Sequence, residues 1–213
     1  GIRHPGETKM TVPDTLEPAS IRQRFRQLAA DRHPLLATMS RDDMYDRGRM
    51  MAPGGMLLAR MMARHLAVGP GARVLDIGCG RGQTSVMLAS EFGADVVSVD
   101  LWTSAQERQL LARQAGVSDR VLALQGDIAR GLARGIPAFD AIFVMQAFHS
   151  FGARRGMLEY LARLLKPGGR IVIGQTCFRG EPGTIPDALR EDDGWNTEYA
   201  RYHSPDWWRA LFL

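Results

Sequence analysis

The sequence predicts an α/β fold: a doubly wound, mostly parallel sheet flanked by helices. Between residues 68 and 175, short apolar runs alternate with stretches of helical apolar periodicity, and glycines mark the junctions. Three carboxylates also stand at the carboxyl ends of successive apolar runs. We expect strands near 73–77, 95–99, 120–125, 139–145 and 170–175, and helices near 83–92, 103–115 and 152–165, with a helical turn near 128–134.

Residues before this region predict a helical cap. Helical spacing of apolar residues indicates helices near 18–30 and 56–66, and a weak capping box indicates one near 41–49. Methionines are concentrated here, and Met44, Met50 and Met51 are candidates for contact with a substrate, with core packing as the alternative. We expect one domain over residues 1–213: a helical lid at 14–67, a cofactor-binding core at 68–175, and a substrate-side loop and aromatic segment at 176–213.

Composition narrows the function classes. With 213 residues and 45% apolar content, the chain can bury the core of one globular domain. The net charge of +4 comes from scattered arginines among acids, so we do not expect a nucleic-acid partner. No apolar run approaches 18 residues, so we expect no membrane span. Two cysteines form no disulfide framework or zinc spacing, which favours the cytoplasm, and we expect no metal site.

The glycine turn after the first strand is the central motif. Gly78, Gly80 and Gly82 alternate with other residues, and Gln83 stands where the dinucleotide fingerprint requires glycine. Asp76 lies within the end of the preceding strand, where a carboxylate would repel a pyrophosphate. The spacing therefore favours an adenosyl ligand with cationic groups, and a Rossmann-like domain with another nucleotide is the alternative.

Four ordered motifs carry a resemblance to a known family. They are Val74 to Gly82, then Asp100, then Gly126-Asp127-Ile128, and finally Leu165-Lys166-Pro167-Gly168-Gly169, the last of which we read as the turn into the fifth strand. Together they resemble the class I S-adenosylmethionine (SAM)-dependent methyltransferases, which have a Rossmann-like fold. Residues 51–55, 100–102 and 202–208 look like the bacterial small-molecule "type 11" and cyclopropane-synthase-like groups. The resemblance implies methyl transfer from SAM to a small molecule, with S-adenosylhomocysteine (SAH) as product.

The resemblance also assigns the cofactor contacts. Asp100 is expected to hold the ribose hydroxyls, Leu101 or Trp102 to flank the adenine, and Asp127 and Ile128 to bind its edge. Around the amino-acid tail of SAM, the expected contacts are Asp76, Gly78, Cys79, Gly80 and Gln146. Cys79 reads as a small turn residue rather than as a nucleophile.

Two histidines are candidates for a general base. His149 follows the fourth strand, and its ordinary pKa lies near neutrality, although a turn histidine satisfied within the fold is an equal reading. His203 is the second candidate and stands just before Ser204-Pro205-Asp206, which predicts the start of a last helix. The family often has a tyrosine before the histidine that corresponds to His149, and Phe148 stands there instead.

Other readings stay open at this stage. The family's sheet normally has seven strands, and only five are predicted, so we expect the sheet to be incomplete and the natural chain to continue beyond Leu213. An RNA or protein methyltransferase, and a SAM-binding protein without methyl transfer, are the rival functions. A homodimer is one option for the oligomeric state.

Overall fold

The structure, a computed structural model, describes residue 27 and residues 55–132, 136, 138–181, 183 and 199–213. The chain divides into two compact units, Gly1–Ser40 and Arg41–Leu213, and the sheet belongs to the second. Gln27 is helical. The other residues of the helices predicted near 18–30 and 41–49, and the candidate methionines Met44, Met50 and Met51, lie outside the described residues. The predicted division into lid, core and aromatic segment stays a prediction.

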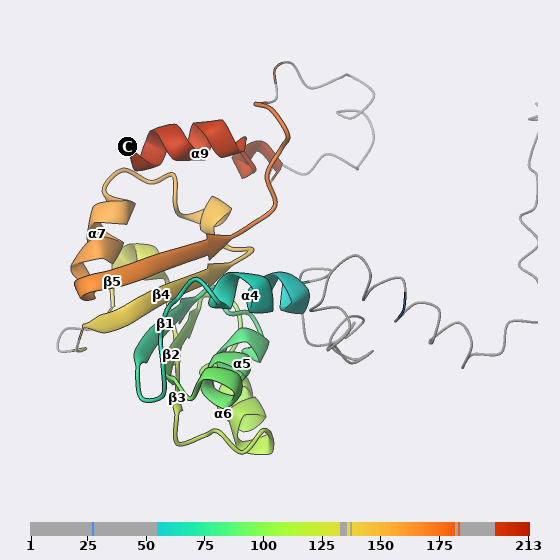
Figure 1. The fold of residues 1–213 in the computed structure, drawn as a ribbon, viewed down its shortest axis with the longest axis vertical. Helices are drawn as coiled ribbons and strands as arrows, with labels where there is room; N and C mark the ends of the chain where they lie inside the picture. Colours follow the sequence, from blue (N-terminus) through green and yellow to red (C-terminus); the bar gives the residue numbers. More distant parts are fainter. Residues whose placement is uncertain (1–26, 28–54, 133–135, 137, 182, 184–198) are drawn as a thin grey trace, which may run out of the picture. The chain divides into compact units, whose positions relative to one another are not determined.

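A five-stranded sheet forms the centre of the second unit, as predicted (Figure 1). Its strands are β1 (Arg73–Ile77), β2 (Asp95–Asp100), β3 (Val121–Gln125), β4 (Phe139–Met145) and β5 (Leu165–Gly174). They run in the order β3-β2-β1-β4-β5, and every pairing is parallel. The strand order therefore reverses at β1: β2 and β3 follow on one side of it, and β4 and β5 on the other. The carboxyl ends of β1 and its two neighbours meet at one edge, where open α/β sheets bind ligands.

Helices cover both faces of this sheet. On one face lie α4 (Gly55–Ala63), α5 (Gln83–Phe92) and α6 (Ala105–Gln114), and on the other lie α7 (Met157–Arg163) and α9 (Pro205–Phe212) (Figure 1). Because both faces are covered, β1, β2 and β4 are almost wholly buried, which explains their continuous apolar runs. Three short 3₁₀ turns, η1 (Ile128–Arg130), η2 (Phe148–Ser150) and η3 (Tyr199–Arg201), complete the described elements.

Local sequence explains where the helices start. Ser104 caps α6, and its hydroxyl accepts a hydrogen bond from the Glu107 N–H. Ser204 caps α9 in the same way by accepting from the Trp207 N–H, with Pro205 in the first turn, so this predicted helix start is confirmed. Between Gly82 and Gly93, both left-handed, α5 occupies the whole of its predicted range.

Two predicted boundaries were wrong. The helix expected at 152–165 begins only at Met157, because Gly156 has a φ of 76° and Gly152 lies against the ring of Phe148. The fifth strand begins at Leu165 rather than near 170. Its pairing with β4 shifts register between Phe139 and Ala141, so the expected turn at Gly168-Gly169 is an irregularity inside the strand.

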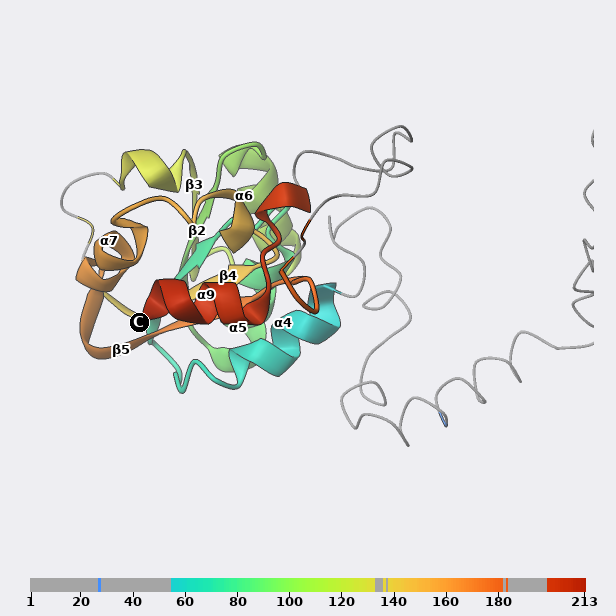
Figure 2. The ribbon, with the colours of Figure 1, turned by 90° about the horizontal axis from the view of Figure 1, so that it is seen from above.

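Aromatic side chains fix α9 to the sheet. The ring of Phe148, just after β4, lies 5.4 Å from that of Trp208 and 5.9 Å from that of Phe212, measured between centroids. Trp208 is part of the same buried cluster as Leu75, Ile142 and the α7 residue Leu161. Seen from above, α9 lies over the strands and its carboxyl end approaches α7 (Figure 2). α9 thus covers one face of the sheet, and its carboxyl end lies on the side of α7 (Figure 2).

Candidate functional site

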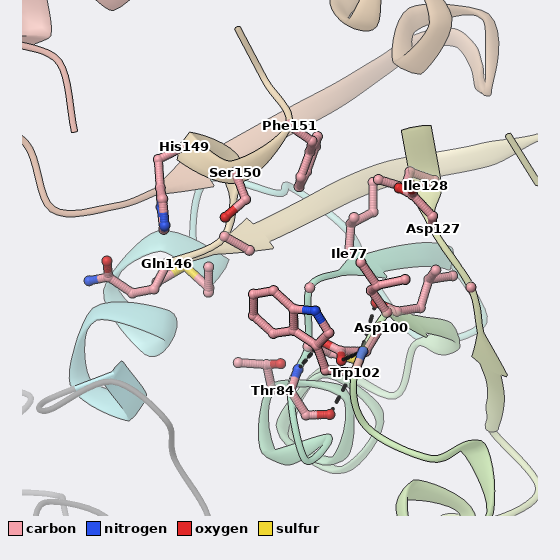
Figure 3. Close-up of a pocket in the computed structure, with 18 of the residues that line it drawn as sticks. Ile77, Thr84, Asp100, Trp102, Asp127, Ile128, Gln146, His149, Ser150 and Phe151 are labelled. Carbon is pink, nitrogen blue, oxygen red and sulfur yellow. Dashed lines mark hydrogen bonds between the residues drawn. The ribbon is translucent and has the colours of Figure 1, made fainter. Parts of the chain in front are cut away.

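A cavity of about 540 Å³ opens at the carboxyl ends of β1, β2, β3 and β4. Residues that follow β5 and residues from η3 complete its wall. The structure brings most of the predicted site residues together there (Figure 3). Those that line the cavity are Gly78, Cys79, Gly80, Asp100, Leu101, Trp102, Asp127, Ile128, Gln146 and His149. Asp76 and His203 do not line it.

The glycine turn uses its own N–H groups to hold the fold. Gly78 donates to the carbonyl of Val99 (2.8 Å), and Gly82 donates to the carbonyl of Cys79 (2.9 Å). Gly80 donates to Oδ2 of Asp100 (2.9 Å). None of these three N–H groups is left for a phosphate. Gly78 also permits close packing, since a Cβ there would lie 2.3 Å from the Cβ of Ala147.

Asp100 organises the loop after β2 and keeps one acceptor site. Its Oδ1 accepts from the N–H groups of Trp102 and Thr103, each at 2.9 Å, while its Oδ2 accepts from Gly80. A carboxylate offers about four acceptor positions, so Oδ2 retains room for a ligand hydroxyl. The side chain is buried but lines the cavity.

The wall beside Asp100 combines apolar faces with a second carboxylate. Leu101 is 50% exposed and Trp102 is 69% exposed, so both offer apolar surface that a flat ring can cover. Asp127 caps η1 by accepting the N–H of Ala129 at Oδ1 (2.9 Å), and Ile128 beside it is buried. Figure 3 shows the ring of Trp102 projecting from beside Asp100 into the middle of the cavity.

Asp76 lies beneath the cavity rather than in its wall. Its Oδ2 accepts hydrogen bonds from the hydroxyls of Thr84 (2.7 Å) and Ser85 (2.6 Å), and the residue is fully buried. Burial raises the pKa of Asp76 from 3.8 to about 6, and the two hydroxyl donors oppose this rise. Thr84 does line the cavity. Asp76 is thus separated from the cavity by Thr84, and its expected role at the tail of SAM, through a direct contact or through water, stays a prediction.

Cys79 has the character of a small buried turn residue. Burial raises the pKa of its thiol to about 12, and the nearby carboxylate of Asp76 adds to the rise. Sγ lies 3.0 Å from Oγ of Ser98. A thiol with this pKa is almost wholly protonated at neutral pH, so it is unsuited to nucleophilic chemistry.

A buried arginine that the sequence did not reveal ties three segments of the cavity wall together. Arg108 of α6 is 1% exposed. Its Nη1 donates to the carbonyl of Thr103 and its Nη2 to that of Leu124, both at 2.6 Å, while Nε donates to Oγ of Ser98 (3.1 Å). The Thr103 hydroxyl in turn donates to the carbonyl of Gly80 (2.5 Å). The one sequence signal for this structural role was that Arg108, a polar residue, occupies an apolar position of the helix.

The loop after β4 supplies the opposite wall. Gln146 has a φ of 53°, unusual for a residue other than glycine, and its Oε1 accepts from the N–H of Thr176 (2.9 Å). His149 is buried, and its ring lies 4.4 Å from that of Tyr202 in an edge-on arrangement. Tyr202 lines the cavity, although the sequence suggested no such place for it. Figure 3 shows Gln146 and His149 on the same side of the cavity.

His203 lies outside the cavity wall and is engaged elsewhere. Its Nδ1 is 2.5 Å from Oε1 of Glu181, and its ring stacks on that of Trp207 with centroids 3.6 Å apart. Hydrogen bonds from His203 and from the N–H of Ser204 lower the pKa of the Glu181 carboxyl. These contacts fix the entry to α9, so of the two histidines only His149 is placed for chemistry in the cavity.

The described residues contain neither a metal-binding cluster nor a membrane-spanning helix. No group of three or more His, Cys, Asp or Glu side chains in the described part of the chain is placed to hold a metal ion. Likewise, none of the helices described here has the length and apolar character needed to cross a membrane.

The fold and the cavity define a Rossmann-like α/β domain with a ligand site at its strand ends. Residues 74–169 match the family described as "Methyltransferase domain". Among curated proteins, the chain is 31% identical over 145 residues to methyltransferase GfsG of Streptomyces halstedii, an alignment covering 66% of this chain and 51% of that protein. It is also 31% identical to the 27-O-demethylrifamycin SV methyltransferase of Amycolatopsis mediterranei, over 62% of this chain and 49% of that protein.

Solved structures agree. A SAM-dependent methyltransferase from Thiobacillus denitrificans, in complex with SAH, superposes with a TM-score of 0.62 at 25% identity, covering 82% of this chain and 69% of that one. One from Geobacter sulfurreducens, also with SAH, gives 0.61 at 26% identity over 80% and 67% of the two chains. Together these matches support a class I SAM-dependent methyltransferase. The chain spans about half the length of the two curated relatives.

Proposed function

We propose that this chain transfers the methyl group of SAM to a small-molecule acceptor by in-line displacement, with SAH as the product. The observation that carries the proposal is the hydrogen bonding of the glycine turn. Gly78, Gly80 and Gly82 donate their N–H groups within the fold, so these three groups are not available to a pyrophosphate. The site presents instead a carboxylate, Asp100, with an acceptor position on Oδ2.

The residues of the cavity fit the parts of SAM. Asp100 would accept a ribose hydroxyl, Leu101 and Trp102 would flank the adenine, and Asp127 with the Ile128 N–H would bind the edge of the ring. The methionine tail would lie along the glycine turn toward Thr84 and Gln146. The Thr84 hydroxyl donates to the buried Asp76, so this side of the wall keeps a negative potential that suits an ammonium group.

The acceptor would enter between the loop after β4 and η3. SAM, when bound, supplies an electrophilic methyl group, so orientation and exclusion of water account for much of the expected rate. His149 is the group placed to take a proton from the acceptor, since it lines the cavity and packs against Tyr202. Gln146 orients this wall through its hydrogen bond to the Thr176 N–H.

We also propose that the acceptor is a small molecule and that the protein acts in the cytoplasm. A cavity of about 540 Å³ accommodates SAM and a compact acceptor together. The curated relatives carry names of small-molecule methyltransferases, such as the 27-O-demethylrifamycin SV enzyme. Cys79 and Cys177 are both free thiols, which is the usual state in a reducing compartment.

SAH formation measured over a panel of small hydroxyl, amine and carbon acceptors tests the reaction. We expect SAH to accumulate with at least one acceptor. His149→Ala should lower kcat by roughly 10²-fold and change the shape of the pH–rate profile. His65→Ala is the matched control, since His65 is an exposed histidine outside the cavity lining.

Three outcomes contradict parts of the proposal. If SAH binds but is never formed over the whole panel, a SAM-binding protein without methyl transfer is favoured. If tRNA competes with the acceptor for binding, and this competition depends steeply on salt concentration, a nucleic-acid acceptor is favoured instead. An unchanged pH–rate profile in His149→Ala would remove this residue as the base.

A further inference from the structure

The acceptor side of the cavity carries more positive charge than the cofactor side. Three arginines line the cavity, Arg81, Arg154 and Arg201, against two carboxylates, Asp100 and Asp127. Both carboxylates belong to the cofactor side and accept backbone N–H groups there. Arg154, in the loop before α7, and Arg201, in η3, belong instead to the segments that form the acceptor wall.

Arg154 and Arg201 differ from those arginines of the fold that pair with an acidic side chain. Arg60 pairs with Glu91, and Arg209 pairs with Asp206. By contrast, the side chains of Arg154 and Arg201 make no hydrogen bond or ion pair with any residue that the structure describes, and both are exposed at the cavity. Cations that face a concave site without internal partners attract anionic ligands.

A second hollow extends this positive charge beside the first. It has a volume of about 270 Å³ and is lined by Arg130, Arg154 and Arg155 among others, so Arg154 is common to both hollows. On the other flank, Arg201 directly precedes Tyr202, whose ring contacts that of His149. The two arginines therefore belong to the segments on either side of the position where the acceptor would meet the methyl group.

We propose that the acceptor carries an anionic group, a carboxylate or a phosphate, that pairs with Arg154 and Arg201. This inference rests on the proposed methyl transfer. Guanidinium groups bind both kinds of oxyanion through paired N–H donors, which fixes the orientation of the bound molecule. The same two cations repel an acceptor with a positive charge, as does the sulfonium of SAM. The specificity of the site thus follows from charge as well as from shape.

Binding of small anions to the protein saturated with SAH tests this inference. Calorimetric titrations would use inorganic phosphate, benzoate and the neutral analogue benzamide. We expect at least one of the two anions to bind, and benzoate, where it binds, to bind more tightly than benzamide. A double variant, Arg154→Gln with Arg201→Gln, should weaken binding of that anion by roughly tenfold. Arg155→Gln is the control, because Arg155 lines only the second hollow.

The three titrations distinguish a phosphorylated acceptor from a carboxylate. Binding of phosphate alone identifies a phosphorylated acceptor, and binding of benzoate alone identifies a carboxylate. The inference is overturned if neither anion binds to the SAH-saturated wild type. It is also overturned if benzamide binds as tightly as benzoate while phosphate does not bind. A double variant that retains wild-type affinity for the anion would overturn it as well. Failure of SAH itself to bind the wild type would instead contradict the proposed function, so the two failures are distinguishable.

Discussion

The two sides of the cavity are built differently. At the ends of β1, β2 and β3, hydrogen bonds within the fold hold the main polar side chains, as Asp100 with its three backbone donors and Arg108 with its four oxygen acceptors demonstrate. After β4 and β5, the wall instead contains the exposed arginines Arg154 and Arg201. Both sides line one cavity, but the side chains of these two arginines make no hydrogen bond or ion pair with any described residue.

This difference separates the two tasks of the site. A wall with its hydrogen bonds already made keeps its shape when a ligand arrives, which suits a cofactor that is the same in every turnover. A wall with charged side chains that are not paired within the fold can discriminate among acceptors by their charge. Substitutions on the cofactor side should therefore affect folding and SAH binding together, whereas those on the acceptor side should affect acceptor choice and leave the fold intact.

Arg108→Met is expected to have the largest effect on stability. The change leaves the carbonyls of Thr103 and Leu124 and the hydroxyl of Ser98 without their donor inside the fold. We expect the free energy of unfolding to fall by about 3–4 kcal/mol and SAH affinity to fall with it. Denaturant unfolding and calorimetry measure the two effects. Arg113→Met, on the exposed side of the same helix, is the control, and equal effects for both variants would contradict the account.

Gly78→Ala tests the contact between the glycine turn and the loop after β4. The added Cβ would meet that of Ala147 at 2.3 Å, whereas at Gly116, which also has positive φ, nothing lies within 4 Å. Backbone strain alone predicts a loss of about 1 kcal/mol for Gly116→Ala. The clash should bring the loss to about 3 kcal/mol for Gly78→Ala. Similar thermal unfolding curves for the two variants would show that the turn and the loop are not in contact.

Asp76→Asn should change how stability depends on pH. Burial raises the folded-state pKa of Asp76 to about 6, so its contribution to stability is full below the ordinary pKa of 3.8 and is lost as pH rises through about 6. We expect wild type to lose about 2–3 kcal/mol across this window that Asp76→Asn does not lose. Groups with lowered pKa, such as Asp140, act in the opposite direction in both proteins and cancel in the comparison. Parallel stability–pH curves would refute the assignment.

The smallest effect on folding is expected at the acceptor side. Arg154→Gln and Arg201→Gln remove charges that make no hydrogen bond or ion pair within the described residues, so each should change the free energy of unfolding by less than about 0.5 kcal/mol. Chemical denaturation of both variants provides the measurement. A large loss from either would mean that its side chain supports the fold, and the contrast between the two sides would disappear.

Much of the fold was predictable because its signals are local. Glycines at both ends of α5 and the serine caps of α6 and α9 mark helix boundaries through the conformation of single residues. Apolar runs buried on both faces mark β1, β2 and β4. Even the errors were local, since the start of α7 depends on Gly156, whose left-handed conformation a helical pattern does not reveal.

The site was predictable only in part, because its remaining features arise from distant segments. Asp76 stands in the expected motif, but whether its carboxylate faces a ligand depends on Thr84 and Ser85, which α5 brings against it. Arg108 is a polar residue on the apolar face of its helix, but its partners become clear only when the loop after β2 folds against it. Likewise Tyr202 reaches the cavity only because α9 packs onto Phe148.

Calorimetric titration of SAH into the wild-type protein tests the central claim most directly. We predict binding of one molecule per chain with a dissociation constant in the micromolar range. Excess NADH should not displace it, and Asp100→Ala should abolish it, whereas alanine at the exposed Asp119 should not. Absence of SAH binding to the wild type, or its displacement by NADH, would show that the strand-end cavity does not serve an adenosyl sulfonium ligand. Retained affinity in Asp100→Ala would contradict the assignment of Asp100 to the ribose.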